Sequence, residues 1–274
     1  MKKVLTIAGS DSTGGAGIQA DLKTFEEFGV FGFSSVTSVV TMDPTNGWTH
    51  EVTVLPEELL RKQLVSVFAG EAIHAIKTGM IGNERNIQVA SEVIKEQSVK
   101  NIVVDPVIAC KGTAQILQPE SVEGLKRYLL PQARVVTPNL VEAGILSGLG
   151  DLKTIDDMKE AAKVIHQLGV ANVVVKGGHR LQETRAVDLC YNGSDFEIFE
   201  GPRYATEYNH GAGCTFAAAI TAALAKGYTV LEAVRVAKLF VAAAIQQGVR
   251  INPYVGHVWH GAYNSAQERM EEVL

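Results

Sequence analysis

Residues 4–17 read VLTIAGSDSTGGAG, a short apolar run followed directly by a loop rich in glycine. The first five of these residues have the aliphatic and β-branched character of a strand. Beyond the loop, apolar residues recur at helical spacing, at Ile18, Leu22, Phe25 and Phe28. This order of strand, glycine loop and helix predicts the opening unit of an α/β sheet.

The same alternation continues along most of the chain. Short β-branched runs that predict strands occur at residues 34–40, 72–78, 101–105, 133–137 and 171–177. Most of them precede a segment of helical period, which predicts a central, mainly parallel sheet flanked by helices on both faces. Residues 185–199 alternate apolar and polar side chains around Asn192-Gly193, so we expect a hairpin at an antiparallel edge.

The remaining segments complete a single predicted domain over residues 1–274. Residues 217–226 and 230–247 are rich in alanine and predict two closely packed helices. Residues 41–56 contain two prolines and an Asn-Gly pair, which interrupt the alternation and predict a small flap at one sheet edge. No repeat and no Pro/Gly/Ser-rich linker divides the chain.

The composition argues against several classes of protein. The chain has 25 Lys plus Arg against 30 Asp plus Glu, without a basic run, which argues against nucleic-acid binding. The N-terminal apolar run is too short for a signal peptide, and no stretch approaches the roughly 18–20 residues of a membrane span. Three cysteines without a CxxC pair, Cys110, Cys190 and Cys214, favour free thiols and a cytoplasmic protein.

The glycine loop lies where open α/β sheets bind ligands. Asp11 and Ser12 follow the first strand, and a helix N-terminus favours an anion. The loop matches neither the Walker pattern nor the dinucleotide fingerprint. A tight turn without ligand is the alternative.

Two further stretches carry oxygen ligands at strand ends. Asp105 follows the strand in VVDPV, and an unpartnered carboxylate there would be costly, so we expect a metal-bound water, a cation or backbone donors beside it. In TPNLVEA, Asn139 and Glu142 are three residues apart at a helix start and share a face. Such oxygens beside phosphates suit Mg²⁺. Helix capping is the alternative for each.

Two more stretches suit anions. Lys176 ends the strand in VVVKGGH and is followed by Gly177 and Gly178, which indicates phosphate contact or an ordinary turn. In YNHGAGCTFAAA the backbone N–H groups of residues 211–213 lead into an alanine-rich helix and form an anion cradle.

Cys214 lies on the rim of this cradle, where a helix dipole lowers a thiol pKa, and His210 could share its proton. A buried, inert cysteine is the alternative. Cys110 lies in a polar loop after Asp105 and is either a reactive thiol or of no consequence.

Six motifs in one order, AGSDSTGGAG, IKTGM, DPV, TPNLVEA, VVVKGG and NHGAGCTFAAA, resemble the ribokinase superfamily. The resemblance is to its hydroxymethylpyrimidine (phosphate) kinase and pyridoxal kinase branch and covers nearly the whole chain. It implies a ribokinase-like α/β domain, usually a homodimer. It also implies transfer of the ATP γ-phosphate, with Mg²⁺, to a primary alcohol on a small heteroaromatic ring.

The resemblance also implies roles for individual residues. Asn139 and Glu142 resemble the nucleotide and Mg²⁺ positions, with Asp105 as a second metal candidate. The phosphate and ATP side takes in Lys176, Gly177, Gly178, His179, Arg180, Asp188 and Lys238. Gly211, Ala212, Gly213 and Cys214 match the anion hole, in which Cys214 replaces the Asp that acts as base in most of the superfamily, assisted by His210. The substrate side takes in Asp11, Ser12, Asp43, Met80 and Asp105.

Two features bear on the substrate. Pyrimidine kinases of the branch carry Gln where this chain has Asp43, and the pair of Cys110 and Cys214 resembles pyridoxal kinases in which a loop thiol adds to the substrate aldehyde. Both imply phosphorylation of the 5′-hydroxyl of pyridoxal, and of pyridoxine and pyridoxamine, in vitamin B6 salvage. The alternatives are a hydroxymethylpyrimidine kinase of thiamine synthesis or a bifunctional enzyme, a cysteine hydrolase, and a non-catalytic nucleotide-binding regulator.

Overall fold

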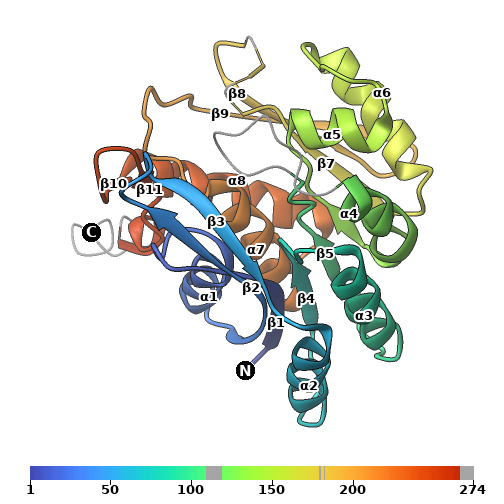
Figure 1. The fold of residues 1–274 in the computed structure, drawn as a ribbon. Coiled ribbons are helices and arrows are strands. Elements are labelled where there is room, and N and C mark those ends of the chain that lie inside the picture. Colours follow the sequence, from blue (N-terminus) through green and yellow to red (C-terminus); the bar gives the residue numbers. More distant parts are fainter. Residues whose placement is uncertain (109–118, 179, 182, 266–274) are drawn as a thin grey trace.

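One mixed β-sheet runs through the protein (Figure 1). The structure is a computed structural model that describes residues 1–108, 119–178, 180–181 and 183–265. Within these residues the sheet has nine strands in the order β3-β2-β1-β4-β5-β6-β7-β8-β9. The strands are β1 (Lys3–Asp11), β2 (Phe31–Asp43), β3 (Thr49–Val54), β4 (Ala75–Thr78), β5 (Ile102–Val104), β6 (Val135–Val136), β7 (Asn172–Lys176), β8 (Ala186–Tyr191) and β9 (Phe196–Gly201).

The sheet is parallel from β2 to β7 and antiparallel at both edges. This confirms the mainly parallel sheet and the hairpin around Asn192-Gly193, where Gly193 has a positive φ of 98°. Residues 41–56 extend the other edge as the β2–β3 hairpin, where the sequence predicted a flap. The chain turns there with Trp48 at a φ of 59°.

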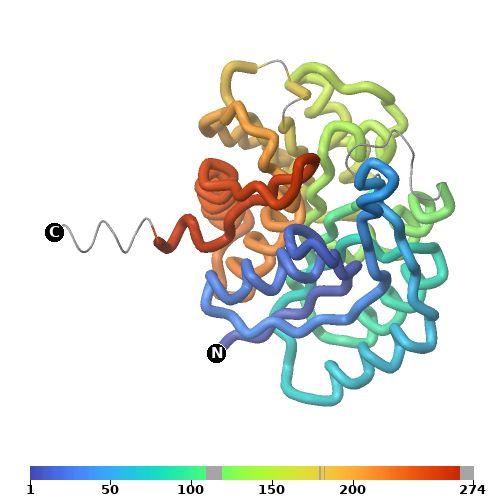
Figure 2. Tube along the Cα trace, turned by 60° about the vertical axis from the view of Figure 1, so that its left-hand side comes forward, coloured from blue at the N-terminus to red at the C-terminus, as the bar shows by residue number. Residues whose placement is uncertain are grey.

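Helices cover both faces of the sheet (Figures 1 and 2). They are α1 (Gly17–Glu27), α2 (Glu57–Phe68), α3 (Glu84–Lys95), α4 (Pro119–Gly124), α5 (Leu140–Ser147), α6 (Ile155–His166), α7 (Ala212–Ala225) and α8 (Val230–Gln246), with π- and 3-10-helical turns at Leu125–Leu129 and Leu130–Gln132. None of the helices in the described part of the chain combines the length and apolar character that crossing a lipid bilayer requires.

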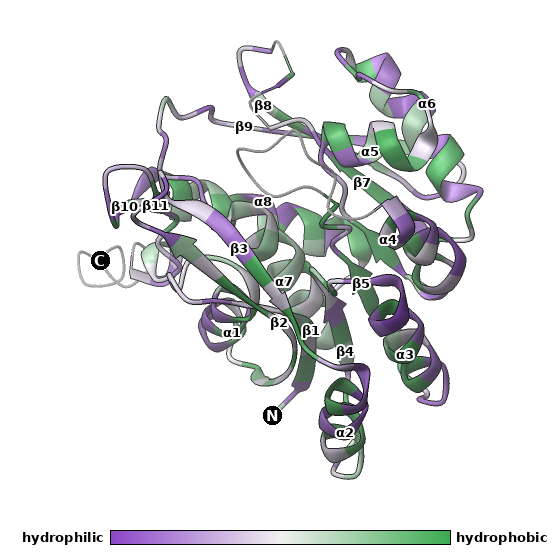
Figure 3. Cartoon of the chain, in the orientation of Figure 1, coloured by the Kyte–Doolittle hydropathy of each residue, from purple (hydrophilic) through white to green (hydrophobic). Residues whose placement is uncertain are grey.

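Alternation along the strands divides the core between the two faces. Val104 and Val136 pack with α2 to α6, whereas their neighbours Val103 and Val135 pack against α7 and α8. The small side chains of α7 let this helix lie close to the sheet, to α1 and to α8. In Figure 3 the central strands are correspondingly apolar.

The last described segment returns to the glycine loop. Strands β10 (Val249–Arg250) and β11 (Gly256–His257) form a small antiparallel sheet. His257 is buried against Gly15, where a Cβ would lie 1.9 Å from its ring. Figure 2 shows this red segment beside the dark blue loop. These two strands were not predicted by the sequence analysis.

Candidate active site

The carboxyl ends of the central parallel strands meet the N-terminus of α7. Asp105 directly follows β5 and Lys176 ends β7, and the Lys176 Nζ lies 3.2 Å from the Asp105 Oδ1. A Cβ built on Gly213, in the first turn of α7, would lie 3.4 Å from the same Nζ. The structure therefore brings together three residues that the sequence placed in separate motifs.

The first turn of α7 offers free backbone donors. The Ala212 N–H donates to the Asn209 carbonyl at 3.2 Å, and the Thr215 N–H donates to the Gly211 carbonyl at 2.9 Å. Among the described residues, the N–H groups of Gly213 and Cys214 donate no hydrogen bond to another part of the chain. Two amides with a nearby lysine at a helix N-terminus form a binding site for an anion.

Two glycines hold this turn against the glycine loop. Gly211 has a φ of 85°, and a Cβ on it would lie 1.7 Å from the Gly15 carbonyl oxygen. Only glycine allows so close an approach with a left-handed backbone. The loop after β1 and the start of α7 therefore form one surface.

Cys214 is half-buried at this surface and is a free cysteine. Burial raises the pKa of the thiol to about 11, against the opposing charge of Lys77. The prediction that the helix dipole would bring this pKa toward neutrality was therefore wrong. Desolvation of the sulfur outweighs the donors around it.

His210 pairs with Asp11, where the sequence predicted that it would assist Cys214. Its Nε2 lies 3.2 Å from the Asp11 Oδ2, and the backbone N–H groups of Thr13 and Ala16 donate to the same carboxylate. Burial raises the pKa of Asp11, but hydrogen bonds from His210 and Thr13 outweigh burial and hold it well below its usual range. The Asp11 carboxylate thus fixes the shape of the glycine loop.

Asn139 and Glu142 form the capping box of α5. The Asn139 side chain accepts from the Glu142 N–H, and the Asn139 N–H donates to the Glu142 Oε2 at 2.8 Å. Burial raises the pKa of Glu142 to about 7, while the charge of Lys176 opposes this rise and that of Asp105 adds to it. The capping alternative is therefore correct, and the Glu142 carboxylate also interacts with the Lys176–Asp105 pair.

The other nucleotide-side candidates surround Lys176. Asp188 lies directly opposite Lys176 on β8 and pairs with Lys238 of α8 at 2.7 Å. Gly177 packs tightly, since a Cβ on it would lie 2.4 Å from the Val187 carbonyl oxygen, and Gly178 has a φ of 56°. Arg180 is exposed. His179 and Cys110 lie outside the described residues.

The substrate-side candidates are more dispersed. Met80 lines a cavity of about 200 Å³ together with Gly79 and Val107. Ser12 is exposed. Asp43 accepts hydrogen bonds from the Thr45 hydroxyl and backbone N–H, which lower its pKa and engage the carboxylate in its own turn.

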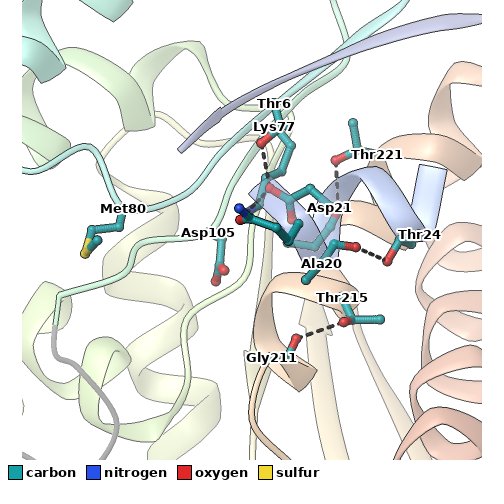
Figure 4. Close-up of polar contacts among 12 residues, drawn as sticks. Thr6, Ala20, Asp21, Thr24, Lys77, Met80, Asp105, Gly211, Thr215 and Thr221 are labelled. Carbon is teal, nitrogen blue, oxygen red and sulfur yellow. Dashed lines mark hydrogen bonds and ion pairs between the residues drawn. The ribbon is translucent and has the colours of Figure 1, made fainter. Parts of the chain in front are cut away.

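One buried ion pair was missed by the sequence reasoning. Lys77 of β4 lies 2.9 Å from Asp21 of α1, and both side chains are completely buried (Figure 4). The Thr6 hydroxyl donates to the same carboxylate oxygen at 2.6 Å. Burial raises the pKa of Asp21. Burial alone would lower the pKa of Lys77, but the negative charges near it, chiefly that of Asp21, outweigh this effect, so the pKa of Lys77 is also raised. A lysine inside the apolar run 72–78 was the available signal.

Comparison with known proteins identifies the family. The phosphomethylpyrimidine kinase family model matches residues 11–259. The chain is 50% identical to a pyridoxine kinase of Bacillus subtilis (strain 168), over 98% of this chain and 99% of that protein. It is 42% identical to a hydroxymethylpyrimidine/phosphomethylpyrimidine kinase of the same organism, over 95% of each chain.

The fold agrees with a solved kinase structure. The structure of the pyridoxal kinase from Staphylococcus aureus in complex with AMP-PCP and pyridoxal matches with a TM-score of 0.91 and 50% identity, over 96% of this chain and 95% of that one. The identity, the coverage and the matched region all lead to one conclusion: the chain belongs to the phosphomethylpyrimidine kinase family.

Proposed function

We propose that this protein is an ATP-dependent pyridoxal kinase that phosphorylates the 5′-hydroxyl of pyridoxal, and also of pyridoxine and pyridoxamine. The observation that carries the proposal is the pair of free amides at the start of α7, beside Lys176. The similarity to the Staphylococcus aureus pyridoxal kinase, whose complex contains AMP-PCP and pyridoxal, supports this choice of substrates. The lower identity to the pyrimidine kinase of Bacillus subtilis makes that activity the second candidate.

In this proposal the transferring phosphoryl group lies over the first turn of α7. The Gly213 and Cys214 N–H groups would donate to its oxygens, and the Lys176 ammonium would offset their negative charge. Because phosphoryl transfer proceeds through a loose transition state, positioning and charge stabilisation account for most of its catalysis. Asn139, Gly177, Gly178, Arg180, Asp188 and Lys238, together with His179, are the candidates for the rest of the nucleotide.

Two buried carboxylates, those of Asp105 and Glu142, could hold Mg²⁺ at this site. Asp105 and Glu142 flank Lys176, and burial keeps the pKa of Glu142 near 7, so a cation beside it would favour the ionised form. No group of three or more His, Cys, Asp or Glu that could hold a metal occurs among the described residues. Mg²⁺ commonly takes only one or two carboxylates together with substrate phosphates. Glu142 and Asp105 would hold the ion, which supplies positive charge to the phosphates when bound.

The chemical step needs an acceptor for one proton. The 5′-oxygen bonds to the γ-phosphorus while the bond from this phosphorus to the bridging oxygen breaks, which releases ADP. We assign the hydroxyl proton to the Cys214 sulfur in its thiolate form. His210 would support this step indirectly, since its bond to Asp11 holds the glycine loop against Gly211.

The vitamin ring would lie between the glycine loop and Met80. Asp11, Ser12 and Asp43 are its polar candidates, and the cavity beside Met80 offers apolar contact. For Cys110 the sequence resemblance implies addition to the aldehyde. Cys110→Ala should therefore reduce turnover of pyridoxal more than that of pyridoxine, which has no aldehyde, and equal losses would contradict this role.

Three further assignments rest on the family resemblance and the composition. The protein is expected to be a homodimer, to form one domain over residues 1–274 and to act in the cytoplasm. Size-exclusion chromatography with light scattering tests the first.

The function is tested by measuring ADP formation with each of four alcohols: pyridoxal, pyridoxine, pyridoxamine and hydroxymethylpyrimidine. The proposal predicts vitamin-dependent ADP release, with pyridoxal giving the highest kcat/KM. Faster turnover of hydroxymethylpyrimidine would favour the second candidate. ADP release that does not depend on any of the alcohols would contradict kinase function. Hydrolysis of a simple p-nitrophenyl ester would favour a cysteine hydrolase.

A further inference from the structure

The imidazole of His260 is buried against the first turn of α7. The residue is only 4% exposed, and its Nε2 lies 3.0 Å from the Thr215 Oγ1. The Thr215 hydroxyl donates to the Gly211 carbonyl at 2.8 Å, and the Thr215 N–H donates to the same oxygen at 2.9 Å (Figure 4). His260, Thr215 and Gly211 therefore form one chain of hydrogen bonds that ends at the N-cap residue of α7.

The single proton of the hydroxyl decides the direction of this chain. Because the hydroxyl donates its proton to the Gly211 carbonyl, its oxygen accepts from His260, whose Nε2 therefore carries the hydrogen. Burial lowers the pKa of His260 to about 4, and the charges of Lys23 and His257 act in the same direction, so the imidazole is neutral near pH 7. A neutral imidazole has one N–H, and the contact with Thr215 uses it.

The backbone just before His260 is fixed by two different parts of the chain. The Val258 N–H donates to the His210 carbonyl at 3.2 Å. The Trp259 N–H donates to the Ala244 carbonyl of α8 at 2.9 Å. The position of the imidazole is thus set by α8 and by the segment that leads into α7.

A second threonine of α7 makes the same kind of bond without the histidine. Thr221 is also completely buried, and its hydroxyl donates to the Ala217 carbonyl at 2.8 Å. Such a bond to the carbonyl four residues earlier is a common way to satisfy a threonine hydroxyl in a helix. Thr215 differs because its hydroxyl also accepts from a buried imidazole, and because its acceptor, Gly211, lies against the glycine loop. The histidine contact therefore acts where the free amides of α7 begin.

We propose that His260, acting through Thr215, is a positioning residue that fixes the first turn of α7, so that the two free N–H groups of this turn point at the transferring phosphoryl group. The inference rests on the proposed function, which assigns these N–H groups to phosphoryl transfer. The two side chains act through the backbone of Gly211 and not through contact with substrate. Their loss should lower kcat and leave the KM for the alcohol unchanged, as for an interaction that matters only in the transition state.

The inference is tested by ADP formation at saturating ATP with the fastest substrate among the four alcohols. Thr215→Val removes the hydroxyl and keeps the side-chain volume, whereas Thr215→Ser keeps the hydroxyl. His260→Phe removes the N–H, and the double variant Thr215→Val/His260→Phe leaves neither polar partner buried without the other, in case a single variant does not fold. Thr221→Val is the matched control, because it removes an equally buried hydroxyl from the same helix. Urea unfolding shows whether each variant is folded under the assay conditions.

A displacement of about 1 Å in a positioning group can reduce a rate roughly 100-fold, so we expect kcat to fall at least about tenfold in Thr215→Val and in His260→Phe. Thr215→Ser and Thr221→Val keep the contact with His260 and should stay within about twofold of the wild type. The double variant should lose no more than the larger single loss, since both changes break the same chain of hydrogen bonds.

An unchanged kcat in the His260→Phe variant, an equal loss of kcat in Thr221→Val, or an effect on KM alone would overturn the inference. These outcomes leave the proposed function intact, because the wild type still turns over. A wild type that forms no ADP with any of the alcohols would contradict the proposed function, and the inference with it.

Discussion

Gly211→Ala tests whether the glycine loop and the start of α7 act as one surface. A Cβ at this position would lie 1.7 Å from the Gly15 carbonyl oxygen, whereas ordinary contact begins at 3.4 Å. The two backbones would therefore have to move apart by about the difference between these two distances, 3.4 − 1.7 = 1.7 Å. The φ of 85° adds strain of about 1–2 kcal/mol for a residue with a side chain.

The chain offers a matched control at the other end of the same helix. Gly227 has a φ of 97° but nothing within 4 Å of a built Cβ. Gly227→Ala should therefore carry only the left-handed strain, about 1–2 kcal/mol in unfolding free energy. Gly211→Ala should lose about 1–3 kcal/mol more, because overpacking adds to that strain.

The kinetic difference should be larger than the difference in stability. A displacement of about 1 Å in a positioning group can reduce a rate roughly 100-fold, so we expect such a loss of kcat in Gly211→Ala and nearly unchanged kcat in Gly227→Ala. The assay is pyridoxal-dependent ADP formation at saturating ATP, with urea unfolding of both variants. Equal kcat values in the two variants would show that turnover does not require the close approach of Gly211 to the glycine loop.

Three other predictions follow from the titrating groups. With a Cys214 pKa of about 11, only about one thiol in ten thousand is ionised at pH 7, so kcat should rise roughly tenfold per pH unit from pH 7 to 9. The Cys214→Ala variant should lower kcat about 10²–10⁴-fold and remove this dependence on pH. A wild-type kcat that does not change with pH would contradict proton transfer to the thiolate. Because burial raises the pKa of Glu142 from 4.5 to about 7, the carboxyl favours folding most below pH 4.5, and stability on the order of 3 kcal/mol is lost as the pH rises to 7. In urea titrations, the Glu142→Gln variant should show a smaller decrease of unfolding free energy over this pH range. An unchanged decrease would show that another group causes it. The lowered pKa of Asp11 has the opposite effect, because the ionised carboxylate stabilises the folded protein. The Asp11→Asn variant should therefore lose about 1.5–3 kcal/mol of unfolding free energy at pH 7, and its difference from the wild type should shrink as the pH falls below about 4. A difference that does not change with pH would show that the ionised form is not what stabilises the fold.

Much of the fold could be predicted because it is encoded locally. Alternating β-branched runs and helical segments indicated the parallel sheet, and Asn192-Gly193 indicated the β8–β9 hairpin. The positions of Asp105 and Lys176 at strand ends were also readable, because parallel strands bring their carboxyl ends to one edge. The β10–β11 sheet was missed because each strand has only two residues.

The electrostatics of the site could not be read in the same way. The Lys77–Asp21 pair joins residues 56 positions apart, and nothing in either local sequence announces the partner. The imidazole of His210 lies four residues from Cys214 in sequence but pairs with Asp11, which is 199 residues away. The thiol pKa depends on how deeply the surrounding elements bury the sulfur, which helix position alone does not determine.

In the proposed reaction the phosphoryl group is transferred over the first turn of α7. The most direct measurement is a crystal structure with ADP, magnesium, pyridoxal and aluminium fluoride as a mimic of the transferring group. We expect fluoride atoms at hydrogen-bond distance, roughly 2.7–3.2 Å, from the Gly213 and Cys214 nitrogens, with the pyridoxal 5′-oxygen facing the aluminium. A mimic bound elsewhere, with these two amides contacting only solvent, would contradict it.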